Sequence, residues 1–145
     1  MDALGIDHLV LTVEDVDRTC SFYETALGAT VRTFDGGRTA LHIGDQKINL
    51  HPAGDEYEPH AERPVPGSGD FCVYTNRSLS AVQAHLDDHD IPLELGPVEK
   101  TGARGQMRSL YVRDPDGNLV EISRYEADAT VTSEESRRTD MDGCP

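Results

Sequence analysis

One carboxylate and one histidine stand out as residues that could bind a metal ion. Glu121 lies in the run Leu119–Tyr125, where apolar and polar residues alternate after the turn sequence Asp114–Asn118. A strand of this kind shows one face to a core and the other to a cavity or to water. Glu121 falls on the second face among apolar neighbours, where an unpaired buried carboxylate is strongly destabilising. It therefore needs a partner.

His8 has a similar setting near the start of the chain. It lies in the apolar run Ile6–Val13, on the face opposite to the larger apolar side chains. Neutral imidazole and carboxylate suit a divalent zinc, iron, manganese or nickel ion with open positions for water and substrate. His8 and Glu121 are thus the starting hypothesis for a metal site. Two simpler interpretations stay open, in which His8 is a core histidine and Glu121 pairs with an arginine such as Arg108.

The first half of the chain contains the elements that would position His8. A helix is expected at Val16–Leu27, because acidic residues precede it, apolar residues recur at helical spacing and Gly28 can end it. Three short strand patterns follow, separated by glycine-containing turns, and the last one ends at His51. Residues 52–68 are rich in Pro, Gly and Glu without periodicity, which indicates a linker or lid.

The second half repeats this order of elements. We expect a strand, a helix, a strand, a glycine-rich loop and two further strands, at 69–75, 79–89, 93–98, 100–105, 108–113 and 119–125. The repeated order predicts an α+β fold with two βαβββ modules in one domain, residues 1–125, module one at about 4–51 and module two at 69–125. Residues 126–145 are polar and acidic without an apolar period, so a disordered tail is expected.

Composition argues against several kinds of partner. The 145 residues include 27 acidic and 13 basic ones, which gives a formal net charge of −14. Such a surface repels nucleic acid and anionic membranes. No segment resembles a signal peptide or reaches the ~20 apolar residues of a membrane helix, and the 3 cysteines form no Cys-x-x-Cys pair. We expect a cytoplasmic protein with a halophile-like acidic coat, the alternative being an acidic surface that binds a basic partner.

Several separated motifs resemble one family. The segments Gly5–Val13, Phe22–Gly28 and Asp114–Ile122 resemble the vicinal oxygen chelate superfamily, which includes glyoxalase I, fosfomycin-resistance transferases, extradiol dioxygenases and bleomycin-resistance proteins. Within it, Gly44–His51 and Pro64–Ser68 are similar to glyoxalase domain-containing protein 5 and its bacterial relatives. The resemblance covers residues 4–125 and implies that the modules form a cup-shaped, curved mixed sheet. One fold hosts many chemistries, so it does not fix the reaction.

The resemblance also implies a set of ligands. In metalloenzymes of this superfamily the first and last strands of each module supply ligands that point into the cup. Here that implies His8 and Asn49 from module one, and Asp70 and Glu121 from module two, with His51 as a further ligand or base. Asn49, a poor ligand, stands where glyoxalase I has a glutamate, so we place it among substrate-binding residues. The simpler interpretations are a strand-end histidine for His51 and a turn-binding carboxylate for Asp70.

Further candidates lie around these ligands. Ser109 and Tyr111 share a strand face, and transferases of the family use hydroxyls at this spacing to hold an anionic substrate. Ser109, Arg38 and Arg108 are therefore candidates for binding substrate, the arginines by supplying charge for an oxyanion. Tyr111 joins His51 and Glu121 as a candidate catalytic residue, although ordinary sheet packing would explain it equally well.

Two classes of function fit these residues. The first is a metal-dependent lyase, isomerase or dioxygenase, in which the ion chelates two neighbouring oxygens of a small substrate and stabilises an enolate or oxyanion. The second is a non-catalytic protein that sequesters a small molecule, as bleomycin-resistance proteins do. The pair His8 and Glu121 favours the enzyme. The family arrangement also implies a homodimer with a site shared between subunits, the alternative being a monomer whose modules pair within one chain.

Overall fold

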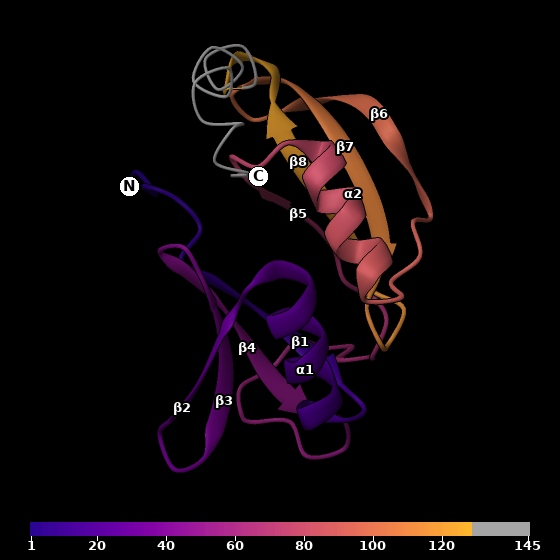
Figure 1. Cartoon of the computed structure of the whole chain (residues 1–145). Helices are drawn as coiled ribbons and strands as arrows, with labels where there is room; N and C mark the ends of the chain where they lie inside the picture. Colours follow the sequence, from indigo (N-terminus) through magenta and orange to yellow (C-terminus); the bar gives the residue numbers. More distant parts are fainter. Residues whose placement is uncertain (129–145) are drawn as a thin grey trace. The chain divides into compact units, whose positions relative to one another are not determined.

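Two four-stranded sheets, each with one helix, form the part of the chain that this computed structural model describes, residues 1–128 (Figure 1). The elements are β1 (His8–Val13), α1 (Val16–Leu27), β2 (Thr30–Phe34), β3 (Arg38–Ile43), β4 (Gln46–Pro52), β5 (Asp70–Tyr74), α2 (Leu79–Asp88), β6 (Leu95–Gly102), β7 (Gly105–Arg113) and β8 (Leu119–Tyr125). This order confirms the predicted α+β fold with two βαβββ modules. Residues 126–128 form a helical turn, and the rest of the expected tail lies outside the described residues.

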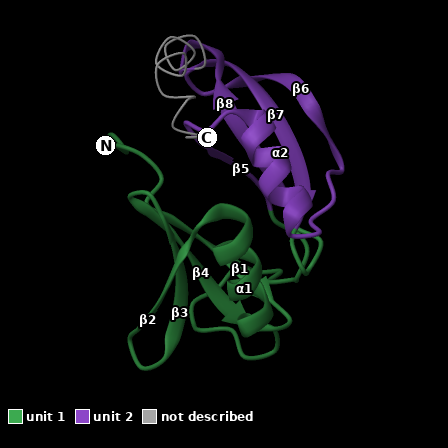
Figure 2. Ribbon diagram, viewed as in Figure 1, with its two compact units in different colours: residues 1–69, 114–118 green, residues 70–113, 119–145 purple. Residues whose placement is uncertain are grey.

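The chain divides into two compact units (Figure 2). Unit 1 comprises Met1–Gly69 together with Asp114–Asn118, and unit 2 comprises Asp70–Arg113 with the residues from Leu119 onward. The segment 52–68, expected to be a linker or lid, is thus part of unit 1, and so is the turn that connects β7 to β8.

The sheet of unit 1 has the strand order β1-β4-β3-β2, in which β1 and β4 are parallel and the other pairs antiparallel. The α1 helix begins where the Asp15 side chain accepts a hydrogen bond from the backbone of Arg18, and it ends at Gly28, which has a φ of 68°. Its buried face, centred on Tyr23, contacts the sheet, where alternate residues of β1 and β4 form the core. The other face of the sheet carries the alternate side chains of these strands.

The sheet of unit 2 has the order β5-β8-β7-β6, with β5 parallel to β8. The α2 helix buries Val82 and Leu86, and the core side of β8 carries Val120 and Ile122, which are 0% and 3% exposed. One prediction was wrong, because residues 100–105 are not a loop. Instead β6 and β7 form a tight hairpin in which Gly102 pairs with Gly105, since two residues suffice for the turn.

A buried polar network in unit 1 fixes the turn from which β8 starts. The Asp114 carboxylate accepts hydrogen bonds from the Tyr23 hydroxyl at 2.8 Å and from the Asn118 side chain at 2.8 Å. Its other oxygen accepts the backbone N–H groups of Asp116 and Asn118, each at 2.9 Å. Burial, together with the charge of Asp114, raises the pKa of Tyr23 far above its ordinary value. The Tyr23 phenol is therefore a permanent donor to this turn.

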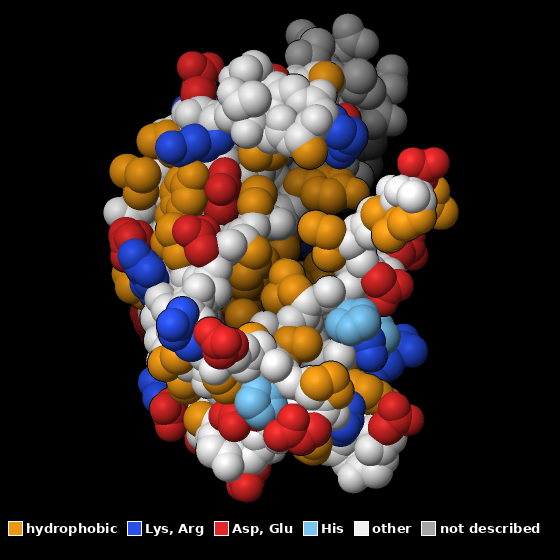
Figure 3. Space-filling model, turned by 180° about the vertical axis from the view of Figure 1, so that it is seen from behind, with side chains coloured by type: hydrophobic (Ala, Val, Ile, Leu, Met, Phe, Trp, Pro, Cys, Tyr) orange, Lys and Arg blue, Asp and Glu red, His pale blue; other side chains and the backbone are white. Residues whose placement is uncertain are grey.

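The surface carries charges of both signs. Acidic and basic side chains are interspersed over the face seen in Figure 3, without one continuous block of either sign. Among the residues that the structure describes, no helix has the length and apolar character needed to cross a bilayer.

Candidate functional site

The strand of Glu121 has the two faces that its alternation predicts. Val120 and Ile122 are buried in the core of unit 2, whereas Glu121 is half-buried on the other face. There Glu121 lies opposite Tyr111 of β7 and beside Cys72 of β5, while Ser109 lies opposite Ser123. The open face of this sheet therefore gathers one carboxylate, three hydroxyls and one thiol.

The hydroxyls hold the Glu121 carboxylate. Its Oε2 atom accepts hydrogen bonds from Ser109 Oγ at 2.7 Å and from Ser123 Oγ at 3.2 Å, and the two serine oxygens are 2.6 Å apart. Both serines are 0% exposed, so their hydroxyls are fixed in place. Within residues 1–128 no arginine, lysine or histidine forms an ion pair with Glu121. The carboxylate is thus held by neutral donors and has no cationic side chain paired with it in this part of the chain.

Tyr111 contributes a phenol to the same face. Burial, followed by the negative charge of Glu121 across the strand pair, raises the pKa of Tyr111 to about 12. The phenol is therefore protonated near neutral pH and can donate a hydrogen bond. This is the state that a group holding a substrate oxygen needs.

Asp70 lies on the same face as Glu121, but Arg108 does not. Asp70 pairs with Leu119, two residues before Glu121, so the two carboxylates are diagonal neighbours with Cα atoms about 8 Å apart. Asp70 is exposed and open to a ligand. Arg108 is adjacent to Ser109 in β7, so the two-residue period of the strand turns its side chain to the opposite face. We therefore leave Arg108 out of the site, both as a substrate-binding residue and as a partner of Glu121.

In unit 1 the candidates lie on the face of the sheet opposite to α1. His8 is paired with Lys47, and His51 is paired with Thr12, so the two histidines stand near opposite ends of the β1–β4 pair. Four residues along a strand and one strand spacing across place their Cα atoms about 14 Å apart. Side chains stand roughly perpendicular to a sheet, so a single ion cannot bind both histidines from this surface. His51, although predicted as a ligand alongside His8, is therefore left out of the metal site.

His8 is oriented by its neighbour. Its Nδ1 atom forms a hydrogen bond with the Asp7 carboxylate at 2.8 Å. With the proton on Nδ1, the lone pair of Nε2 is free, which is the arrangement that carboxylates impose on metal-binding histidines. The side chain is 43% exposed and thus accessible to an ion.

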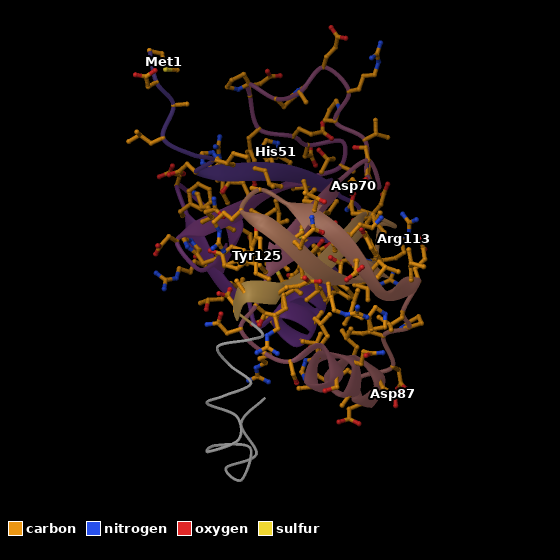
Figure 4. All side chains as sticks on the ribbon, turned by 90° about the horizontal axis from the view of Figure 1, so that it is seen from above. Met1, His51, Asp70, Asp87, Arg113 and Tyr125 are labelled. Carbon is orange, nitrogen blue, oxygen red and sulfur yellow. The ribbon has the colours of Figure 1, made fainter. Side chains whose placement is uncertain are left out.

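His51 borders a cavity that belongs entirely to unit 1. The cavity has a volume of about 570 Å³ and is lined by Val10, Leu11, Thr12, His51, Pro59, His60, Ala61, Arg63, Pro64, Val65, Ser68, Gly69 and Asn118. His51, labelled in Figure 4, is 6% exposed, and burial together with the nearby charges of Arg38 and His60 lowers its pKa. The His51 and Tyr57 rings pack edge to face with 5.2 Å between centroids, and the Arg38 guanidinium lies 4.3 Å from the centre of the Tyr57 ring.

Two atoms on this face have no hydrogen-bond partner. His51 Nδ1 and Asn49 Oδ1 are buried and unpaired within the described part of the chain. Both residues lie on β4 two positions apart, so they share a face. The sequence could not reveal this, because the burial of these atoms depends on how the chain packs around β4.

Sequence reasoning also missed two contributors. His60 lies in the segment 52–68, which was expected to be a linker or lid, and it lines the cavity together with Arg63. Ser123 alternates with Glu121 along β8, and that two-residue spacing was the signal that could have identified it. In the residues with described placement, no three His, Cys, Asp or Glu side chains are close enough to hold a metal ion together. His8 belongs to unit 1, and Asp70 and Glu121 belong to unit 2.

Comparison with known proteins agrees with this architecture. The model of the Glyoxalase/Bleomycin resistance protein/Dioxygenase superfamily matches residues 5–122. The chain belongs to this superfamily. It is 52% identical over 120 residues to virulence protein STM3117 of Salmonella typhimurium, covering 83% of each chain. The crystal structure of that protein superposes with a TM-score of 0.85 at 50% identity, covering 86% of this chain and 99% of the other.

Two further relatives have names that give a domain type or an activity. Glyoxalase domain-containing protein RDO1 of Mycosarcoma maydis is 51% identical over 122 residues, covering 84% of this chain and 69% of the relative. Metallothiol transferase FosB of Shouchella clausii is 29% identical over 130 residues, covering 81% and 78%. The superfamily resemblance seen in the sequence motifs is thus confirmed.

Proposed function

We propose that this protein is a metal-dependent enzyme of the superfamily that acts on a small substrate with two neighbouring oxygens. The observation that carries the proposal is the Glu121 carboxylate, which is half-buried on an open face, fixed by hydroxyls and unmatched by any cation in residues 1–128. A divalent ion would compensate this charge. Superfamily members commonly use divalent metals, and one relative is named a metallothiol transferase.

The donor chemistry of three residues fits such an ion. Ser109 and Ser123 both donate to Oε2 of Glu121, so neither serine uses Oε1, which we assign as the ligand atom. Asp70 is a second carboxylate on the same face. His8 offers Nε2, because Asp7 occupies Nδ1. Two carboxylates and an imidazole suit zinc, iron, manganese or nickel.

The residues around these ligands have separate tasks. When bound, the ion would act as a Lewis acid toward the oxygens of the substrate. Tyr111 is a protonated phenol near neutral pH, and its raised pKa of about 12 extends that state further into alkaline pH, so its hydroxyl can donate to a substrate oxygen in place of Glu121. Ser109 and Ser123 keep the Glu121 carboxylate from rotating, which preserves one orientation toward the ion.

This ligand set requires both units, so we further propose a homodimer in which unit 1 of one chain meets unit 2 of its partner. The support is that neither unit contains three suitable ligands among its described residues. The open sheet faces also carry exposed apolar side chains, including Val10 at 45% and Tyr74 at 66% exposure. In the proposed dimer the partner would cover these side chains.

Metal analysis of protein purified without chelator tests the ion. The expected result is a bound divalent metal that is lost in His8→Ala and retained in His89→Ala, a control that removes an exposed histidine of unit 2. His8→Ala with full metal content, or wild-type protein without metal after reconstitution with each candidate ion, would refute the proposed site.

Co-refolding tests the sharing between subunits. A mixture of His8→Ala and Glu121→Gln chains would form heterodimers in about half of the molecules, and each heterodimer keeps one intact site. About a quarter of the wild-type metal sites should therefore return. A site within one chain would return none.

A non-catalytic binding protein is the second candidate, and the cavity in unit 1 favours it. That function needs no metal. Ligand binding by metal-free protein, together with no bound metal under any condition, would support this second candidate over the first.

A further inference from the structure

Two arginines lie side by side on the core side of the unit 2 sheet, at the end where β8 finishes. Arg108 of β7 and Arg124 of β8 are directly opposite each other in this antiparallel pair of neighbouring strands (Figure 1). Their Cα atoms are therefore about 5 Å apart, and their side chains leave the same face of the sheet. Ser109 and Ser123, the residues next to them, belong to the opposite face with Glu121. The two arginines are thus separate from the proposed metal site.

Neither guanidinium has a partner for its charge in residues 1–128. No hydrogen bond or ion pair joins Arg108 or Arg124 to another described side chain. Glu99 of β6 is opposite Arg108 on the other side, but it is exposed and forms no ion pair with that arginine. Like charges that stand directly opposite each other in a strand pair are destabilising. An anion between the two arginines would remove this repulsion.

Arg124 carries a second sign of a missing partner. Its Nε atom is buried and has no hydrogen-bond partner among the described residues. The other buried side-chain atoms of this kind belong to unit 1, at Asn49, His51 and Asp116, so in the described part of unit 2 the feature is confined to Arg124. A buried unpaired N–H in a folded protein calls for an explanation, and a bound ion is one of the common ones.

The chemistry of two guanidiniums selects the kind of anion. Each offers five N–H donors, no acceptor and a permanent positive charge. A carboxylate would match one of the two charges. A phosphate group carries about −1.5 to −2 at neutral pH and has several acceptor oxygens, so it can bridge both. The net charge of −14 repels a polyanion such as nucleic acid, which favours a single phosphate group.

We propose that Arg108 and Arg124 bind one phosphate dianion on the core side of the unit 2 sheet. The phosphate oxygens accept hydrogen bonds from the terminal nitrogens of both guanidiniums, and rotation of the Arg124 side chain brings its Nε–H to the same anion. Glu99 borders the site and weakens binding by repulsion. The proposed metal ligands lie in unit 1 and on the other face of this sheet, so phosphate binding here does not depend on the ion.

Calorimetry on the full chain tests this inference, at about pH 7.5 with EDTA present and the ionic strength held constant. The probes are inorganic phosphate and phenyl phosphate, and dimethyl phosphate is the control with a single charge. We expect phosphate to bind about tenfold or more tightly than dimethyl phosphate, because one anion must match two guanidiniums. Phenyl phosphate that binds as tightly as phosphate, or more tightly, assigns the site to phosphomonoesters, and weaker binding assigns it to free phosphate.

Variants of the two arginines show where the anion binds. Arg108→Gln and Arg124→Gln should each weaken phosphate binding about tenfold or more, whereas Arg18→Gln, which removes an exposed arginine of α1, should leave it unchanged. Glu99→Gln should strengthen it. Arg108 is exposed, so Arg108→Gln leaves the packing intact and decides the test even where Arg124→Gln lowers stability.

NMR of the arginine side chains supplies a second readout. Phosphate should shift the Nε–Hε signal of Arg124, assigned with Arg124→Gln, and leave that of Arg18 in place. No binding at millimolar phosphate, equal affinity for phosphate and dimethyl phosphate, or an equal loss in Arg108→Gln and Arg18→Gln would overturn the inference. Because EDTA is present, these outcomes are independent of whether the metal proposal holds.

Discussion

Replacement of Ser109 by alanine tests whether hydroxyls hold Glu121 in place. The substitution removes the 2.7 Å hydrogen bond to the carboxylate and the 2.6 Å contact with Ser123. A hydrogen bond to a charged group contributes about 1.5–3 kcal/mol. Ser123 keeps its own bond to Oε2 and water can reach the half-buried carboxylate, so the lower part of this range is expected.

Urea unfolding with EDTA present measures this effect. Ser109→Ala should lower the free energy of unfolding by about 1.5–2 kcal/mol. That corresponds to a fall of about 3–8 °C in Tm. The control is Ser21→Ala, which removes an exposed hydroxyl from α1. With metal added, Ser109→Ala should also weaken metal affinity about 10- to 100-fold, as loss of an outer-shell partner does. Unfolding free energies equal in the two variants would refute the reasoning.

Two further predictions concern unit 1. The pKa of His51 is lowered by burial and by Arg38, so the unfolded chain binds its proton more tightly than the folded chain does. Stability from this residue is complete above pH ~6.5 and is lost on acidification below it. Urea unfolding at pH 7.5 and 5.5 should therefore show a smaller loss in His51→Gln than in wild type, and an equal loss would contradict the assignment. Tyr23→Phe should cost about 1.5–3 kcal/mol in unfolding free energy, because it removes a buried 2.8 Å bond to Asp114. Tyr57→Phe is the control, because the Tyr57 hydroxyl donates no described hydrogen bond. Equal unfolding free energies in the two variants would exclude a stabilising role for the bond between Tyr23 and Asp114.

Regular alternation made the last strand predictable from sequence. The bounds of β8 agree with the predicted run Leu119–Tyr125, and α1 agrees with the predicted Val16–Leu27. In both, apolar periodicity and a terminating turn or glycine act together. Glycines misled the prediction at residues 100–105, because glycine also permits the tight turn of a long hairpin.

The site was predictable only where it depends on strand period. That period places Glu121, Tyr111 and Ser109 on one face, and applied to Arg108 it would have excluded that residue. The register between neighbouring strands could not be predicted in the same way, because it depends on strand pairing that a single sequence does not show. The separation of His8 from His51 and the role of His60 in the cavity depend on that registry and on the path of residues 52–68.

The two modules differ most where packing constrains them least. Each sheet must bury an apolar face under its helix, so Leu11 and Leu50 in unit 1 have the same task as Val120 and Leu110 in unit 2. The opposite faces do not have to pack against a helix, and the chemical types of their side chains differ between the two units. Unit 1 carries imidazole, amide and guanidinium groups there, and unit 2 carries carboxylate and hydroxyl groups. Hydroxyls that fix a carboxylate suit a metal ligand, whereas the face of unit 1 places the imidazole of His51 in the wall of a cavity, so the two faces offer different chemistry although the two modules share one fold.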